Sequence, residues 1–453
     1  MLQLKVAPKV ISFLLIICFS ISLVTGWMSY QSGKRALEEF SFNQLTAIRA
    51  IKSNQMRNYL EFIEAQIQTL SQSRMTIDAM QEYKSAFTAL SQELMAAKRP
   101  TEMVKAGSPL YSYYESEFLP RLEKGSREAQ ELDQFLPNSD VSIYLQHHYI
   151  AKNAAPVGSK DEMNNAQDGS SYSAVHEKYH SIFRSYLQKF GYYDIFLIDD
   201  ETGEIIYSVF KETDYATSLI SGAFSRSNIA DAFQSARELK TSDAVKFTDF
   251  KYYEPSYGAP AAFVGSPIYE GDTRVGVLVF QLPVDQINEI MTGGQNWIND
   301  GLGNSGETYL VGSDGSMRSV SRFLIEDRDG YFEALRGLSY PEKTIKQLDN
   351  FDTSILLQNV QTQAATQALS GKTETAIIED YRGVSVLSSY TPLKYGDDQW
   401  AVISEIDAAE AFAPVAKLSQ NLALSAVVIA LGVGLIAALV AGRFIGPIRA
   451  LAG

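Results

Sequence analysis

Two long apolar segments, one near each end of the chain, limit most strongly what this sequence can fold into. Residues 10–27 read VISFLLIICFSISLVTGW without a charge, and residues 423–441 form a similar stretch. A helix of about 20 apolar residues is long enough to cross the hydrocarbon core of a membrane. Lys9 precedes the first segment and Arg443 follows the second, so the positive-inside rule places both ends in the cytoplasm. The long region between the segments is therefore expected on the outer side.

A cleaved signal peptide is the alternative interpretation of the first segment, since it also has a basic start and an apolar middle. No small-x-small cleavage site follows the segment, and Trp27 and Tyr30 lie where interfacial aromatic residues are common. We therefore expect a retained helix. The single cysteine, Cys18, lies within this segment, so we expect no disulfide in the outer region.

The composition indicates a folded chain and excludes some classes of partner. With 453 residues and 45% hydrophobic content, the chain has room for more than one packed core. Its formal net charge of -14 leaves no surplus of Lys and Arg for nucleic-acid phosphates, so we expect no nucleic-acid partner. The sequence has no Walker loop and no Gly-x-Ser-x-Gly elbow, so we expect neither catalysis nor a cofactor in this stretch.

Helical spacing of apolar residues dominates the first part of the outer region. Residues 34–98 contain almost no Gly or Pro and repeat apolar side chains every three or four positions, as at Tyr59 and Ile63. This apolar stripe fits a dimer seam and packing on a following sheet equally well. The pattern weakens into short helical pieces over 99–169 and returns at 173–190.

From residue 194 the pattern changes to short strands, and their order recurs later in the chain. FLIDDETGEIIYS at Phe196 is echoed by YLVGSDGSMRS at Tyr309, and each is predicted to form a strand, an acidic-glycine turn and a second strand. GAPAAFVGSPIY and GVSVLSSYTPLKY, further along, carry a proline at the same offset. Internal duplication is the simplest account. Each unit is predicted to be an antiparallel sheet with helices on one face.

These stretches resemble double Cache domains, the paired PAS-like extracytoplasmic sensor modules of bacterial chemoreceptors, sensor kinases and nucleotide cyclases. The resemblance is carried by GYYDIFLIDDETGEIIYSVFKETDYATSL from Gly191, GNSGETYLVGSDGSMRSVSRF from Gly303 and the SPIY segment that leads into GVLVFQLPVDQI. The last residues, GRFIGPIRALAG, are similar to the opening of a HAMP linker, with Pro447 at the position of that module's first-helix proline.

The resemblance implies an α+β fold, in which long N-terminal helices and two tandem PAS-like antiparallel-sheet modules lie between two transmembrane helices. In this family the membrane-distal module usually holds the ligand, and the membrane-proximal module passes the change to the second membrane helix. The expected parts are a cytoplasmic N-terminus (1–9), transmembrane helix 1 (10–28), a helical region (29–190), the distal module (191–299), the proximal module (300–421), transmembrane helix 2 (422–442) and the start of a HAMP linker (443–453).

Aromatic and polar residues are concentrated in the expected distal module and form the candidate ligand site. A small-molecule pocket is typically an aromatic and apolar cup with a few fixed polar groups. Lys211 could meet a carboxylate, and Asp249 could meet an amine. The alternative is that the tyrosines serve sheet faces and the charges lie in solvated turns. The candidate ligand-binding residues are Tyr193, Tyr207, Lys211, Asp214, Asp249, Tyr252 and Tyr257.

Family members that bind free amino acids share an Arg-x-Trp-Tyr stretch, which this chain lacks, so an amino-acid ligand loses support. Two other clusters are weaker candidates. Arg318 and Arg322 could clamp an anion, although local bridging to nearby acidic residues explains them more simply. His176 and His180 match H-E-x-x-H, but the position of Tyr186 lacks the third histidine of an extended zincin, so we expect no metal site.

The function that these observations favour is the sensing half of a chemotaxis receptor in the bacterial inner membrane. Its expected partners are a small-molecule ligand, the lipid bilayer, a second copy of the chain in a homodimer, and cytoplasmic signalling proteins reached through an output domain beyond Gly453. The input half of a sensor histidine kinase or of a receptor nucleotide cyclase is the first alternative. A membrane-anchored binding protein without a signalling role is the second.

Overall fold

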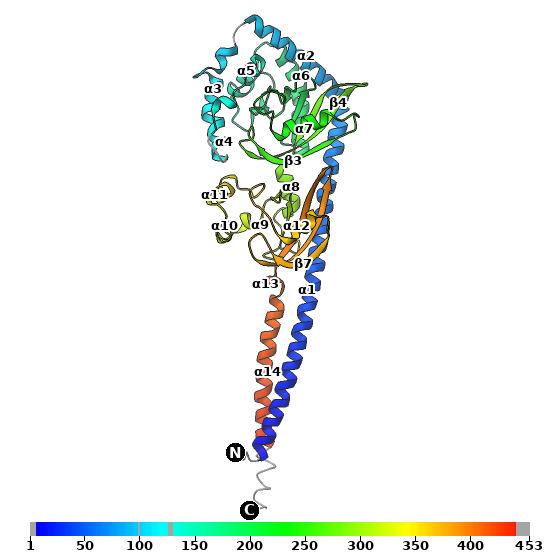
Figure 1. The fold of residues 1–453 in the computed structure, drawn as a ribbon, viewed down its shortest axis with the longest axis vertical. Helices are drawn as coiled ribbons and strands as arrows, with labels where there is room; N and C mark the ends of the chain where they lie inside the picture. The colour runs from blue at the N-terminus through cyan, green and yellow to red at the C-terminus, as the bar shows by residue number, and fades with distance from the viewer. Residues whose placement is uncertain (1–5, 98–99, 126–129, 441–453) are drawn as a thin grey trace, which may run out of the picture.

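The computed structural model describes residues 6–97, 100–125 and 130–440. The predicted HAMP start at 443–453 lies outside these residues. Figure 1 shows an elongated molecule in which two helices lie side by side at the end that carries both termini. Two β-sheets with their helices are stacked along the longer of these two helices, which confirms the predicted α+β architecture with two antiparallel sheets.

The longer helix, α1, spans the 66 residues Val6–Ser71. At 1.5 Å per residue such a helix is about 100 Å long. Although the sequence pattern predicts helix throughout 34–98, α1 stops just before α2 (Arg74–Ala97). The break lies at Ser73, whose Oγ accepts a hydrogen bond from the backbone N–H of Thr76 at 3.2 Å. A serine in this position is a typical helix N-cap, so a new helix begins there.

Short helical pieces follow α2, as the weakened pattern predicts. They are η1 (Pro100–Val104), α3 (Pro109–Tyr113), η2 (Tyr114–Phe118), α4 (Leu119–Gly125), η3 (Leu132–Gln134), α5 (Asp140–Gln146), η4 (His147–Ala151) and η5 (Lys160–Glu162). The longer helix α6 (Ser171–Phe190) confirms the prediction for 173–190. Its N-cap is Ser170, and it ends at Gly191, which has a positive φ of 75°.

The sheet farther from the two termini in Figure 1 is called the distal sheet. Its strand order is β2-β1-β5-β4-β3, and all neighbouring strands are antiparallel. Gly265 faces α7 (Asn228–Arg237), where its backbone is so close to Ala236 that an added Cβ would clash. The next residue, Ser266, faces α1, and its hydroxyl lies 3.0 Å from that of Ser71. Because neighbouring residues of a strand point to opposite faces, α7 and α1 cover opposite faces of this sheet. The strands are β1 (Asp194–Asp199), β2 (Ile205–Ser208), β3 (Lys246–Tyr253), β4 (Ala259–Glu270) and β5 (Thr273–Gln281).

The proximal sheet has the order β6-β9-β8-β7, which matches the order β1-β5-β4-β3 of the distal sheet. Its strands are β6 (Glu307–Val311), β7 (Glu374–Glu379), β8 (Ser385–Tyr395) and β9 (Asp398–Asp407). A counterpart of β2 does not occur among the described residues, so the second strand predicted after Tyr309 is wrong. An isolated bridge between Met317 and Val311 and a hydrogen bond from the Arg318 backbone N–H to the Leu310 carbonyl at 2.8 Å join this segment to β6.

The remaining helices connect the sheets and surround the proximal one. α8 (Val284–Thr292) leads from β5 toward β6, and β9 continues through the short α13 (Ala408–Ala411) into α14 (Ala413–Val440). The others are α9 (Arg322–Glu326), α10 (Arg328–Gly337), α11 (Glu342–Phe351) and α12 (Gln363–Leu369).

Both sheets are attached to α1. Arg49 Nη1 donates to the carbonyl of Tyr390 in β8 at 3.0 Å, and the Tyr192 hydroxyl beside β1 donates to Gln66 Oε1 at 2.8 Å. Toward the end of the molecule that carries both termini, α14 packs closely on α1, where an added Cβ on Gly33 would lie 3.8 Å from the Leu418 side chain. Among the described residues, two helices are long and apolar enough to cross a membrane, namely the one that includes Leu15–Ser71 and the one that includes Ala413–Ile436.

Candidate ligand-binding site

A cluster of buried tyrosines fills the space between α2, α6 and β2 in the distal module. Tyr83 of α2 and Tyr207 of β2 are fully buried, and their ring centroids are 4.8 Å apart. Buried hydroxyl groups normally have hydrogen-bond partners. The Tyr207 hydroxyl lies 2.8 Å from His180 Nδ1, whereas the Tyr83 hydroxyl has no partner among the described residues. The other fully buried members of the cluster are Tyr149, Tyr172 and Tyr215.

Lys211, a predicted site residue, reaches into this cluster. Its side chain is buried, and its Nζ donates to the carbonyl of Val209 at 3.0 Å. The same atom lies 5.6 Å from the ring centroid of Tyr207 and 5.8 Å from that of Tyr149. Burial lowers the pKa of Lys211 to about 7, although Asp194 favours the charged form. An ammonium group has three donors, so this one can also serve an anionic ligand.

The two histidines of the H-E-x-x-H stretch lie on α6 with stacked rings whose centroids are 4.3 Å apart. The carbonyl of Asp161 can only accept, so His180 Nε2 donates to it at 2.7 Å, and Nδ1 accepts from the Tyr207 hydroxyl. Burial, followed by the charge of Lys211, lowers the pKa of His180 to about 2. Both ring nitrogens of His180 are therefore occupied. Among the described residues, no group of three or more His, Cys, Asp or Glu could hold a metal ion.

Three buried carboxyl groups, those of Asp194, Glu212 and Asp214, belong to the same part of the distal module as Lys211. Asp194 accepts a hydrogen bond from the Ser208 hydroxyl at 2.7 Å, and Asp214 accepts one from the Tyr253 hydroxyl. The second oxygen of Asp214 has no partner among the residues that the structure describes. Burial raises the pKa of Asp194 to about 6, that of Asp214 to about 7 and that of Glu212 to about 8. The cluster therefore titrates near neutral pH.

Glu212 connects this buried cluster to the boundary between the modules. Its Oε1 accepts from the Tyr193 hydroxyl at 2.9 Å, and its Oε2 accepts from the Ser256 hydroxyl at 2.6 Å. Gln281 Nε2 lies 3.3 Å from the same serine oxygen. Gln281 Nε2 is placed to donate to this oxygen. Its own Oε1, which is buried, is left without a partner among the described residues.

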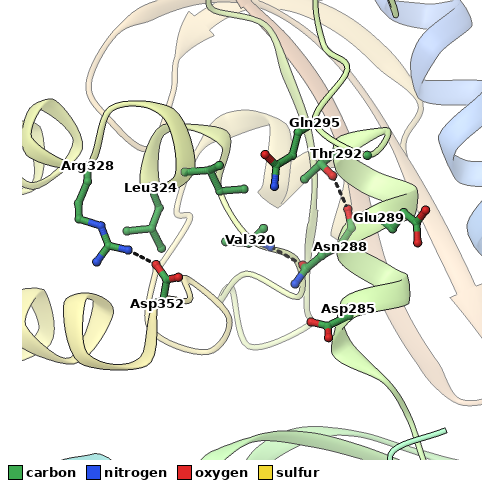
Figure 2. A pocket seen from close by; sticks show the side chains of 11 residues that line it. Asp285, Asn288, Glu289, Thr292, Gln295, Val320, Leu324, Arg328 and Asp352 are labelled. Atoms are coloured by element: carbon green, nitrogen blue, oxygen red, sulfur yellow. Dashed lines mark hydrogen bonds and ion pairs between the residues drawn. The ribbon is translucent and has the colours of Figure 1, made fainter. Parts of the chain in front are cut away.

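Two adjoining pockets lie along α8, where the modules meet. The first has a volume of about 430 Å³, and its lining includes Tyr193, Ser256 and Gln281 from the distal module and Phe351, Asp352 and Thr353 from the proximal one. The second, shown in Figure 2, has a volume of about 530 Å³. Asp285, Asn288 and Asp352 line both pockets. In Figure 2 Arg328 reaches Asp352, and Asn288 accepts from the backbone of Val320 at 2.8 Å.

The other predicted site residues, Asp249, Tyr252 and Tyr257, lie outside the tyrosine cluster. Arg318 binds Asp249 through two nitrogens, with Nε and Nη2 at 3.1 and 2.9 Å from Oδ2. Tyr252 packs against the core of the proximal module, and the Tyr257 ring lies near Arg121. Asp249 and Arg318 were placed by the sequence in two separate candidate clusters, and the fold joins them into a contact between modules. Arg322, by contrast, is bridged locally to Glu326, as predicted.

We expect Arg318→Met to weaken the contact between the modules, because it leaves the Asp249 carboxylate partly buried without its guanidinium partner. The free energy of unfolding should fall by about 2 kcal/mol, measured by urea denaturation. Arg336 provides the control, since its ion pair with Glu342 is exposed. Arg336→Met should change the same quantity by less than about 0.5 kcal/mol. Equal losses in the two variants would contradict a special role for Arg318.

Several residues that complete these sites were not predicted as site residues. Tyr83 lies within the helical pattern over 34–98, and Tyr149, Ser256 and Gln281 carry no signal of their own. The available hint was the local density of tyrosines on either side of the histidine pair. Only the fold shows that tyrosines from α2, η4 and β2 converge on Lys211.

Comparison with known proteins gives the family. The sequence profile described as Cache domain, dCache_1, matches residues 34–415, which is most of the chain. The protein belongs to the Cache domain family. It is thus a sensor domain, and the two sheets on one long helix are its paired modules. No curated protein matches the sequence.

Solved structures similar to this Cache domain include three chemoreceptor domains of low sequence identity. The ligand-binding domain of the Pseudomonas fluorescens chemoreceptor CtaA with L-serine is 13% identical, with 59% of this chain and 90% of that chain covered and a TM-score of 0.31. The periplasmic sensory domain of the Campylobacter jejuni chemoreceptor Tlp1 is 15% identical, with 59% and 90% covered and a TM-score of 0.34. The domain of the Pseudomonas aeruginosa amino acid chemoreceptor PctC with GABA is 14% identical, with 48% and 74% covered and a TM-score of 0.29.

Proposed function

We propose that this chain is the sensing and transmission half of a bacterial chemotaxis receptor, anchored in the inner membrane by α1 and α14. The observation that carries the proposal is the arrangement of a Cache domain between two apolar helices that pack on each other at the membrane end. The HAMP-like end of the sequence supports an output on the cytoplasmic side, since paired outer modules followed by HAMP are common in chemotaxis receptors.

The ligand proposed for the distal module is a small organic anion held at Lys211. Among the described residues the buried ammonium makes a single hydrogen bond, and Asp194 is the main charge that favours its protonated form. The nearby Tyr83 hydroxyl has no partner among the described residues, and a buried hydroxyl group normally has one. A carboxylate would supply a charge for Lys211 and acceptors for the hydroxyl. Tyr207 and Asp214 stay within the proposed site, whereas Tyr193 lines the pocket between the modules.

The relay would run from the proximal module through α13 into α14. Glu410 of α13 accepts hydrogen bonds from the backbone N–H groups of Asn304 and Ser305, both at 2.8 Å. A shift of the loop before β6 would therefore be passed to the start of α14. A ligand can bias such a shift only if it binds the two arrangements with different affinity.

Disulfide crosslinking between the membrane helices tests this relay. Ser22 and Ala423 line the same crevice between α1 and α14. In a Cys18→Ala background, we expect the crosslinking rate of Ser22→Cys with Ala423→Cys to change when a ligand found by thermal-shift screening of organic acids is added to membranes. An unchanged rate with a confirmed ligand at saturation would contradict the relay.

The homodimer would form along the free face of α1. Phe40, Ile51 and Phe62 are exposed on α1 and spaced by 11 residues, which places them on one side of a helix. Because large exposed apolar side chains in such a row favour a protein partner, we expect Ile51→Cys in the Cys18→Ala background to form a disulfide-linked dimer in membranes. Asn288→Cys, on α8, is the control. Equal dimer yields at the two positions would contradict an α1 seam.

A further inference from the structure

The smaller pocket between the modules has an acidic lining. Asp285 and Asp352 contribute carboxylates to it, and no Lys, Arg or His side chain lines it. The Asp285 carboxylate makes no hydrogen bond or ion pair within the part of the chain that the structure describes. Arg328 of α10 forms an ion pair with Asp352 (Figure 2). Arg328 also pairs with Asp349 at 2.7 Å. The pocket therefore favours a positively charged occupant.

A second, independent observation is the unsatisfied amide oxygen of Gln281 in the wall of the same pocket. The Gln281 side chain is 3% exposed. Gln281 Nε2 donates to Ser256 at 3.3 Å, and its Oε1 has no donor among the described residues. A buried acceptor without a donor is costly. An N–H group of a ligand would remove this cost.

The rest of the lining suits an aliphatic or aromatic framework. Tyr193, Pro260, Leu282 and Phe351 line the pocket, and the faces of tyrosine and phenylalanine rings attract cations. Its volume of about 430 Å³ lies within the range of small-molecule sites. The occupant that fits all of these groups is an amine with an apolar chain.

We propose that the pocket between the two modules is a second binding site, for a small organic cation that carries a primary ammonium group. Gln281 Oε1 accepts a hydrogen bond from the ammonium, and the carboxylates of Asp285 and Asp352 balance its charge. The site is separate from the one proposed at Lys211. Because its lining comes from both modules and from α8 between them, the bound cation holds the modules in one relative position.

Calorimetric titration of the full chain in nanodiscs with cadaverine tests the proposal. Cadaverine is expected to bind, and glutarate, which has the same chain length and the opposite charge, is not expected to occupy this pocket. Asp285→Asn should weaken cadaverine binding about tenfold. Asp285 is exposed, so its variant should fold normally. The matched control is Asp272→Asn, an exposed carboxylate in the β4–β5 turn at the other end of β5 from Gln281, which should leave the affinity unchanged.

A Gln281→Met variant and a Lys211→Met variant complete the test. The site between the modules is supported if Gln281→Met binds cadaverine more weakly than the wild type and Lys211→Met binds it with unchanged affinity. Loss of cadaverine binding in Lys211→Met, equal losses in Asp285→Asn and Asp272→Asn, or no binding by the wild-type chain overturns it. None of these readouts uses the crosslinking of α1 to α14, so a failed relay leaves this inference standing, and a failed inference leaves the relay standing.

Discussion

Replacement of Lys211 by methionine is expected to stabilise the free protein and to remove its affinity for a carboxylate ligand. The ammonium is buried with one hydrogen bond, and methionine provides an unbranched side chain without a charge to bury. Because burial lowers the pKa of Lys211 to about 7, the charged ammonium opposes folding near neutral pH, and we expect the free energy of unfolding to rise by about 1–2 kcal/mol in urea denaturation. The affinity for an organic acid found by screening should fall at least about tenfold in calorimetric titration.

The control for this variant is Lys251→Met, which removes an exposed lysine paired with Asp231 at 2.8 Å. In Lys251→Met the free energy of unfolding and the affinity for the organic acid should stay close to the wild-type values, because exposed ion pairs contribute little to stability. Two outcomes would count against the proposed distal site. Wild-type affinity in Lys211→Met would exclude Lys211 as the anchor, and a large loss of stability would assign Lys211 a structural role.

The stability of the protein should depend on pH through the buried carboxyl groups of the distal module. The pKa of Glu212 is raised from 4.5 to about 8 and that of Asp214 from 3.8 to about 7. The folded state therefore binds more protons than the unfolded state, and the stabilisation that is present at low pH is lost as pH rises through these values. In the double variant Glu212→Gln Asp214→Asn, the loss between about pH 4.5 and 7 should be smaller than in the wild type by about 6 kcal/mol, of which each carboxyl group contributes about half.

The measurement is urea denaturation at a series of pH values, with the difference between the double variant and the wild type as the result. Burial lowers the pKa of His147 to about 4 and that of His180 to about 2, so the histidines act in the opposite direction over the same range. Both proteins contain them, and their effect cancels in the difference. Glu307→Gln, which removes a buried carboxyl group of the proximal module, shows how much of the slope has another origin. Parallel curves for the double variant and the wild type would rule out the distal cluster as a cause.

Much of the fold could be predicted because its elements have strong periodic patterns. The strands β1 and β5 are apolar and largely buried, and the turns before and after them contain Gly, Asp and Pro. The helical pattern over 34–98 was also clear, but a periodic pattern does not show where one helix ends and the next begins. The break at Ser73 depends on one capping hydrogen bond, which the apolar spacing does not reveal.

The candidate site could be predicted only in part, because its groups meet through contacts that are distant in the sequence. Lys211 and Asp214 were found through the local density of aromatic and charged residues. Tyr83 comes from a helix more than a hundred residues earlier, and nothing in its neighbourhood distinguishes it from a packing residue. Asp249 was predicted as a ligand contact from its local sequence. In the fold, its carboxylate is instead bound by Arg318 of the other module. A local pattern gives the chemistry of a residue, whereas its partner depends on the fold.

α1 is continuous between the two residues that attach the modules to it, so the number of residues in this segment sets the orientation of one module relative to the other. The proximal module is attached at Arg49 and the distal module at Gln66, with uninterrupted helix between them. Each residue of an α-helix advances the chain by about 100° around the axis. An insertion or deletion of one residue between these points would thus turn one module by about that angle relative to the other. This stretch should tolerate substitution far more readily than any change in the number of its residues.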